Sequence, residues 1–396
     1  MRTSIARFLV PVVLLVSCVI LGAVAGGSAG APARYRVTHL AQLGGTVSRA
    51  NSINNGGWIS GYSNLAGNTS RHAALWLYGT LTDLGTLGGP NSSVVWPVKN
   101  ETGLIAGIAQ TATPDPLGEN WSCAAFFPAA TATGKTCLGF AWKWGVMRAL
   151  PTLGGNNGFV AGANNRGQVS GWAENAVHDP TCTPPQVLQF RAVVWGPGRT
   201  QVRELPPLPG DSTSAATGIN DRGQVIGISG ICDQAVGRLS AKHAVMWENG
   251  VPTDLGDLGG PGWNTAMAIN QRGDVVGFAG SPGDDLDNPK LRAFLWTRRD
   301  GIQDLGTLPG DLTSEAHAIN ERRQIVGVSC DAAGSCRAVL WQNGTIVDLN
   351  SQVVPGYAGV LTNGQDINDF GEITGRAFVP ATGERPAFVA RPVGRK

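Results

Sequence analysis

The residues with most scope for chemistry lie in one acidic run. Gly283 to Asn288 contains Asp284, Asp285 and Asp287, and carboxylate and carbonyl oxygens are the ligands that Ca²⁺ accepts. The spacing does not match an EF-hand loop, so a solvated acidic loop is the simpler interpretation. The three aspartates are candidate ligand contacts; no cofactor is expected, and Ca²⁺ at this run is the alternative.

Three tryptophans, Trp121, Trp172 and Trp263, also interrupt the regular pattern of the chain. Exposed indole rings can stack on sugars or on peptide side chains, whereas buried rings pack beneath loops. The sequence leaves both roles open. These tryptophans join the aspartates as candidate contacts for a glycan or protein ligand.

Catalytic chemistry finds little support among the remaining polar residues. His72 and His243 stand where other copies of the repeat described below have Arg292 and Arg337, and only His178 lies outside the repeat. The chain contains no Gly-x-Ser-x-Gly, no HExxH and no phosphate-binding loop. A nucleophile, a base and an orienting group must converge at one place, so we assign no catalytic residue.

A phrase in which asparagine is followed seven residues later by glycine recurs along the whole chain. Its seven copies are Asn54/Gly61, Asn100/Gly107, Asn164/Gly171, Asn220/Gly227, Asn270/Gly277, Asn320/Gly327 and Asn368/Gly375. A period of roughly 50 residues indicates one structural unit repeated seven times.

Each copy contains four short β-prone segments. Two of them flank an Asn-x-x-Gly turn, typical of a hairpin with glycine at positive φ. A third ends in tryptophan, as at Trp296, and this ring is expected to fill the space between neighbouring units. A fourth leads to Asp-Leu-Gly, as at Asp304, and the recurrence of this aspartate predicts a structural hydrogen bond. Four antiparallel strands per unit predict an all-β, seven-bladed β-propeller.

The two ends of the chain predict how the ring closes. The last copy stops after its third strand, 386–389, while an additional fourth strand, 35–40, precedes the first copy. If this N-terminal strand completes blade seven, the ring closes and no exposed sheet edge remains. Residues 34–396 then form a single propeller domain.

Insertions are expected on one face of that propeller. The Asn-x-x-Gly and Asn-Gly turns would lie on one face, and the longer connections 109–138, 173–189, 229–241 and 279–291 on the other. Loops on a rigid scaffold carry function more often than tight turns. We therefore expect a binding site on the face that carries the insertions.

The N-terminal 33 residues resemble an export signal. Arg2 and Arg7 precede an apolar stretch that gives way to small residues from Gly26 onward, which predicts a cleaved signal peptide, a short linker and a secreted protein. An uncleaved N-terminal helix is one alternative. Lipid attachment at Cys18, which follows Leu15-Val16-Ser17, is another.

Six cysteines remain after that segment, an even number that favours disulfides in an exported chain. Proximity in sequence suggests Cys123–Cys137 and Cys330–Cys336, which leaves Cys182 with Cys232, although six cysteines allow 15 connectivities. A zinc site is the weaker alternative because no CxxC pair is present.

The composition of the chain limits the classes of partner that it can bind. Charged residues make up 15% of the chain and the formal net charge is +2, so no nucleic-acid-binding surface is expected. No apolar run after residue 26 is long enough to cross a bilayer. A monomer is expected.

The repeated phrases resemble those of the bacterial extracellular HAF-repeat family. They are the five-residue phrases that begin at His72, His243 and Arg292, the run from Asp83 to Gly89, and the Ile-Asn turns. The resemblance covers about residues 35–390, although no copy contains an intact His-Ala-Phe. It implies an exported repeat protein and transfers no catalytic residue.

These features together predict a binding or scaffold module. A polysaccharide hydrolase or lyase that uses acids from the insertions is one alternative, and would place two buried carboxylates in one pocket. A structural spacer without a ligand is the other.

Overall fold

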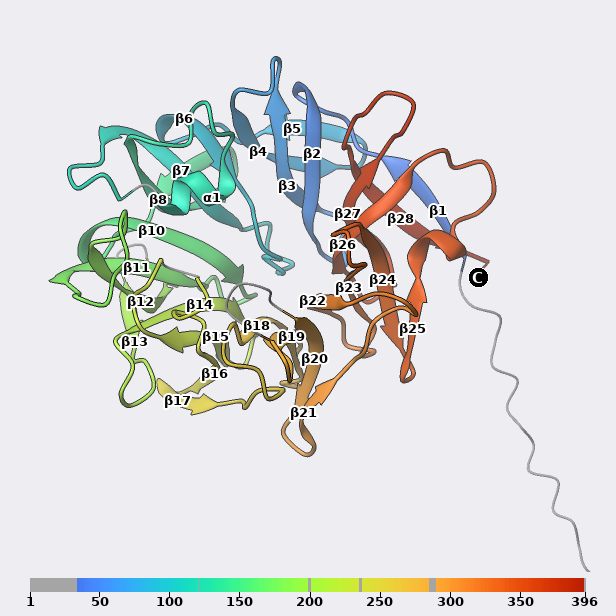
Figure 1. The fold of residues 1–396 in the computed structure, drawn as a ribbon. Helices are drawn as coiled ribbons and strands as arrows, with labels where there is room; N and C mark the ends of the chain where they lie inside the picture. The colour runs from blue at the N-terminus through green and yellow to red at the C-terminus, as the bar shows by residue number, and fades with distance from the viewer. Residues whose placement is uncertain (1–33, 120, 199–200, 235–236, 285–289, 395–396) are drawn as a thin grey trace, which may run out of the picture. The chain divides into compact units, whose positions relative to one another are not determined.

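The computed structural model describes residues 34–394, except 120, 199–200, 235–236 and 285–289. These residues form seven four-stranded antiparallel sheets. Figure 1 shows the sheets as blades around one axis, with the chain passing from blade to blade in sequence order. The predicted seven-bladed β-propeller is therefore confirmed.

Blades 1 to 4 follow the chain without crossovers. Their strands are β2 (Gly44–Ile53), β3 (Ile59–Leu65), β4 (Arg71–Leu77) and β5 (Thr80–Asp83); β6 (Gly88–Ser93), β7 (Ile105–Pro114), β8 (Lys135–Lys143) and β9 (Val146–Ala149); β10 (Gly154–Ala163), β11 (Val169–His178), β12 (Leu188–Trp195) and β13 (Val202–Leu205); and β14 (Thr213–Ile219), β15 (Val225–Gly230), β16 (His243–Glu248) and β17 (Val251–Asp254).

Blades 5 to 7 repeat this order, and blade 7 ends with the N-terminal strand. Their strands are β18 (Thr265–Ile269), β19 (Val275–Gly280), β20 (Leu291–Thr297) and β21 (Gly301–Asp304); β22 (Thr313–Ile319), β23 (Ile325–Cys330), β24 (Cys336–Gln342) and β25 (Thr345–Asp348); and β26 (Val360–Ile367), β27 (Ile373–Phe378), β28 (Ala387–Val393) and β1 (Arg34–His39). Two short helices are added, α1 (Trp121–Phe126) and the 3₁₀ helix η1 (Leu349–Gln352).

Ring closure occurs as the chain ends predicted. β1 pairs antiparallel with β28 from Arg34 opposite Val393 to His39 opposite Phe388. Figure 1 shows the blue first strand beside the red last strand in one blade. The outer edge of blade 7 is therefore formed by the other end of the chain, which couples the two termini of the domain.

The glycine of the recurring phrase is required by a close backbone approach. In blade 5 the inner strand has a register shift between Ala266 and Ala268, typical of a β-bulge. It brings the carbonyl oxygen of Thr265 to 1.9 Å from the position that a Cβ on Gly277 would take. The equivalent glycines meet inner-strand carbonyl oxygens at 1.9–2.1 Å, so only glycine fits.

The asparagine of the phrase closes its own turn and contacts the next blade. Asn220 Oδ1 accepts from the backbone N–H groups of Arg222 and Gln224, while its Nδ2 donates to the carbonyl oxygen of Asn270. Six of the seven asparagines donate in this way to the next blade. The phrase is thus a structural joint between blades.

The third-strand tryptophans fill the space between blades. Trp247 is 1% exposed, and its indole N–H donates to the carbonyl oxygen of Pro206 in the preceding connection. Trp76, Trp195 and Trp341 make the same kind of bond. This confirms their predicted place at the blade interfaces.

None of the helices in the described part of the chain is long and apolar enough to cross a membrane. The expected signal segment, residues 1–33, lies outside the described residues.

Candidate functional site

We call the face with the Asn-x-x-Gly turns the turn face and the opposite one the loop face. At the turn-face end of the axis, the residue after each asparagine joins a closed belt. Each backbone N–H donates to the side chain of the equivalent residue in the next blade, at 2.6–3.0 Å. The belt residues are Asn55, Glu101, Asn165, Asp221, Gln271, Glu321 and Asp369. Their acids are therefore occupied in joining blades.

Blade 2 departs from this regularity and sends side chains across the axis. Ser93 and Arg49 are equivalent, because their carbonyl oxygens lie against Gly107 and Gly61 of the recurring phrase. Ser93 precedes Asn100 by seven residues, whereas Arg49 precedes Asn54 by only five. The additional length carries Lys99 to the buried carboxylate of Asp366 in blade 7, at 2.8 Å.

The same insertion in blade 2 carries Trp96 to the loop-face side of Lys99. The indole N–H of Trp96 reaches the sulfur of Met267 in blade 5, at 3.3 Å.

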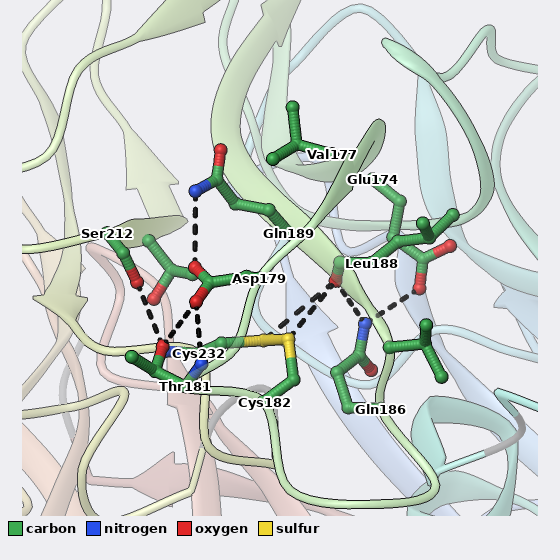
Figure 2. Close-up of a disulfide and its surroundings, with 12 residues drawn as sticks. Glu174, Val177, Asp179, Thr181, Cys182, Gln186, Leu188, Gln189, Ser212 and Cys232 are labelled. Atoms are coloured by element: carbon green, nitrogen blue, oxygen red, sulfur yellow. Dashed lines mark hydrogen bonds between the residues drawn. A yellow bond between two sulfur atoms is a disulfide. The ribbon is translucent and has the colours of Figure 1, made fainter.

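The loop face is held by links that run from blade to blade. All three expected disulfides are present: Cys123–Cys137, Cys182–Cys232 and Cys330–Cys336. Cys182–Cys232 joins the insertions of blades 3 and 4, and Figure 2 shows it beside Thr181 and Asp179, which are hydrogen bonded to each other. Three disulfides are typical of a chain that folds in an oxidising environment.

Two buried carboxylates join the insertions of blades 2 and 3. Glu119 accepts from the backbone N–H groups of Val187 and Leu188, and Glu174 accepts from those of Asn156 and Asn157. Both acids are 0% exposed. Burial, followed by the charge of Glu119, raises the pKa of Glu174 to about 8.

Gln186 bridges the Glu119–Glu174 pair. Its amide nitrogen donates to Glu174 at 3.0 Å (Figure 2) and lies 3.5 Å from Glu119. Because protein groups enclose both carboxylates, the pair serves to hold the loops and offers a sugar no access.

An aromatic layer lies beneath these loops. Trp96 packs edge-on against Phe126 and Phe159, with ring centroids 5.5 and 5.2 Å apart. The layer continues through Trp172 to Phe190. Only Trp96 and Phe126 in this layer are partly exposed, so they are the rings that a ligand on the loop face would reach.

Three arginines adjoin the exposed end of this aromatic layer. Arg49 comes from β2, Arg71 from β4 and Arg376 from β27, and we call them the arginine cluster. The Arg71 guanidinium lies 4.1 Å over the ring of Tyr62 and donates to the carbonyl oxygen of Phe126 at 2.7 Å. The cluster and the aromatic layer are therefore contiguous.

The cluster carries more positive charge than its surroundings neutralise. Within the described residues none of the three arginines forms an ion pair, and the buried Nε of each lacks a hydrogen-bond partner. Burial, with repulsion from Arg376 and Arg71, lowers the pKa of Arg49 to about 10 despite opposing effects of Tyr62 and Glu315. With a pKa of about 10, Arg49 keeps its charge at neutral pH.

The pKa of Tyr62 indicates the same excess of positive charge. Burial alone would raise its pKa, but the charges of Arg71, Arg49 and Arg376 together lower it below the usual value. Other polar groups lie at the edge of the cluster: Gln365 accepts from Arg49, and the buried His317 contacts the carbonyl oxygen of Gly364 and the carboxylate of Glu315.

The structure separates the six residues expected to contact a ligand. Trp172 is 1% exposed within the aromatic layer, and the partly buried Trp263 lies beneath the loops. Asp284 is buried, pairs with Arg238 at 3.3 Å and accepts from the backbone N–H of Lys290. The side chain of Trp121, at the start of α1, lies outside the described residues, as do Asp285 and Asp287.

The recurring Asp-Leu-Gly aspartates are structural, as their repetition predicted. Asp83 accepts from the backbone N–H of Gly85 and from His72, and Asp254 repeats this arrangement with Gly256 and His243. Among the described residues, no group of three or more His, Cys, Asp or Glu side chains is placed to hold a metal ion.

Two larger hollows lie on the turn face. One, of about 550 Å³, is lined by arginines whose neighbours include Glu248, Asp274 and Asp300. Arg298 and Arg323 pair with the first two of these acids at 2.7 Å, so most of its charge is compensated. The other, of about 510 Å³, is mainly apolar and contains the exposed Trp144. Neither hollow combines uncompensated charge with an aromatic layer.

No family model and no curated protein matches the chain. Among solved structures it is similar to Pyrococcus horikoshii acylaminoacyl peptidase, with 8% identity and a TM-score of 0.49 over 89% of this chain and 53% of that one. This chain thus spans about half the length of the peptidase.

Two further structures show comparable similarity. AofleA from Arthrobotrys oligospora has 8% identity and a TM-score of 0.33, over 80% of this chain and 86% of that one. Trypanosoma rangeli sialidase has 10% identity and a TM-score of 0.37, over 90% and 58%. Identities this low concern the fold and carry no information on activity.

Proposed function

We propose that this protein is an exported binding module that takes its ligand at the loop-face end of the axis. The observation that carries the proposal is the contact between the arginine cluster and the partly exposed aromatic rings, made where Arg71 meets Phe126. Unpaired charge beside exposed aromatic surface is costly in a free protein, and is typical of surfaces that bind a ligand.

The contacts that join the insertions of the loop face support this proposed binding site. The pair of Glu119 and Glu174 and the disulfide Cys182–Cys232 hold insertions of blades 2, 3 and 4 in place, and Arg238 with Asp284 extends the series to blade 5. A rigid surface binds with less loss of conformational entropy than a mobile one. We also propose that the chain belongs to the HAF-repeat family, on the strength of its repeated phrases alone.

Glycan-array and peptide pull-down screens with the purified full chain test the proposal. We expect a ligand that the wild type retains and that Arg376→Gln loses, while Arg272→Gln, on the exposed turn face, still binds it. Silence in both screens, or equal loss with both variants, would contradict the proposal and leave the structural spacer.

A further inference from the structure

The arginine cluster is electrostatically incomplete. Glu315 is the one carboxylate that acts electrostatically on Arg49, and it also contacts His317 at 3.2 Å. Partly buried cations without a counter-charge lose hydration that neutral acceptors such as Gln365 and the Phe126 carbonyl replace only in part. An anion bound among the three arginines would supply the missing charge.

The cluster is held on strands, so its geometry does not depend on a loop. Arg49 lies directly opposite Tyr62 in the hairpin of blade 1, and Arg376 lies opposite Asn363 in blade 7. Tyr62 lies among the guanidiniums and acts as their common spacer. Such preorganised arginines favour a planar, two-oxygen anion, because a guanidinium donates two parallel N–H groups to a carboxylate.

The neighbours of the cluster indicate what bears the anion. The amides of Gln365 and Asn363 provide neutral hydrogen-bonding groups on one side. Trp96 and Phe126 provide partly exposed ring surface on the other. Hydroxyl-binding amides together with a stacking surface match a sugar ring better than a flexible acidic peptide.

We propose that the ligand of the loop face is an acidic saccharide of the uronic acid type. Its carboxylate binds to Arg49, Arg71 and Arg376, while its ring packs against Trp96 and Phe126. This inference rests on the proposed binding function and adds the chemical class of the ligand.

The decisive experiment compares matched ligands. Calorimetry would use oligomers of galacturonic, glucuronic and mannuronic acid, their carboxyl-reduced neutral counterparts, and oligoglutamate of equal charge. We expect at least one oligouronate to bind roughly tenfold to a hundredfold more tightly than its reduced form, and more tightly than oligoglutamate. Its affinity should also fall with added salt.

Three results would overturn this inference. They are equal binding of acidic and reduced sugars, oligoglutamate binding as tightly as any oligouronate, and no binding of any probe. If glycan arrays then identify a neutral sugar, binding on the loop face survives and only the acidic class fails. If arrays and pull-downs are also silent, the proposed function fails as well.

Variants separate recognition from folding. Arg376→Gln should lose roughly tenfold or more in oligouronate affinity, and its melting temperature should stay constant or rise because a repulsive charge is removed. Arg272→Gln is the matched control and should change neither. If Arg376→Gln fails to fold, Arg376→Lys keeps the charge and should lose affinity with the loss of its paired donors. Wild-type affinity in a folded Arg376→Gln would contradict the inference.

Discussion

The two ends of the propeller axis are built from the same inner hairpins but treat charge in opposite ways. At the turn face, acids such as Glu101 and Asp221 each accept a backbone N–H from the neighbouring blade, and the belt closes on itself. At the loop face, Arg49, Arg71 and Arg376 form no ion pair within the described residues, and the buried Nε of each lacks a hydrogen-bond partner. The belt acids at the turn face hold neighbouring blades together, whereas the arginines at the loop face form no ion pair within the described residues.

This difference shows that recurring residues and residues that break the repeat have different roles. Residues that recur in every blade are bound to the next blade, so their chemistry is already used. A residue that breaks the repeat without finding a partner costs stability, and its retention indicates a role outside folding. Four expected outcomes test this contrast between the two ends.

The largest effect should come from the shared scaffold. Gly277→Ala would place a Cβ 1.9 Å from the carbonyl oxygen of Thr265, so the bulged strand would have to move. We expect a loss of more than about 3 kcal/mol in the free energy of unfolding, measured by urea denaturation. Gly344→Asn is the control, because that turn position has open space and φ +74°. Equal stability of both variants would contradict the bulge explanation.

A second test uses Glu174, a buried acid that helps to hold the insertions of the loop face in place. The pKa of Glu174 rises from 4.5 when exposed to about 8 when folded. Between these values the folded protein holds a proton that the unfolded chain has released, so its stability falls as pH rises from about 4.5 to 8. Above pH 8 the full penalty is present. Each unit of the shift corresponds to about 1.4 kcal/mol.

Glu174→Gln should abolish that loss, because the amide is neutral at every pH. The neighbouring titratable groups are Glu119 and Asp115, which bonds to Asn157. Melting temperatures from pH 4 to 9 should converge at low pH and diverge above pH 5, with the variant the more stable. The exposed Glu204→Gln should follow the wild type. Parallel curves for Glu174→Gln and wild type would show that Glu174 is ionised in the folded protein.

A smaller effect is expected at the turn-face joint. Asn220→Ala removes two bonds within its turn and one to the carbonyl oxygen of Asn270, all in a buried place. We expect about 2 kcal/mol of destabilisation in urea unfolding. Arg222→Ala, in the same turn, removes only a side chain that is not part of the joint and should change stability by less than about 0.5 kcal/mol.

The sequence predicted the architecture because its signals are periodic. Strand number, ring closure and the structural role of Asp83 and Asp254 all follow from positions that recur, and the three disulfides follow from cysteine spacing. The break in blade 2 was not predicted, because two additional residues before Asn100 look like ordinary variation until Trp96 and Lys99 are seen to cross the axis.

The arginine cluster was also missed, because its members lie far apart in the chain and meet only when the ring closes. A signal did exist. The residue after the recurring glycine is apolar or aromatic in the other copies, for example Ile108, Ile228 and Val328, but it is arginine at Arg376. A charged residue at a position that is apolar in the other copies is therefore the sequence signal for this cluster.

The smallest expected effect separates the two ends directly. Sulfate should bind weakly to the arginine cluster and raise the melting temperature above its value in chloride of equal ionic strength. If 100 mM sulfate exceeds its dissociation constant about tenfold, linkage gives a gain of about 1.4 kcal/mol. Sulfate also stabilises proteins by exclusion from their surface, and that part should be the same in all variants. The excess should disappear in Arg376→Gln and persist in Arg272→Gln, because only the first removes a member of the arginine cluster. An equal sulfate response in all three proteins would mean that the arginine cluster holds no charge available to an anion.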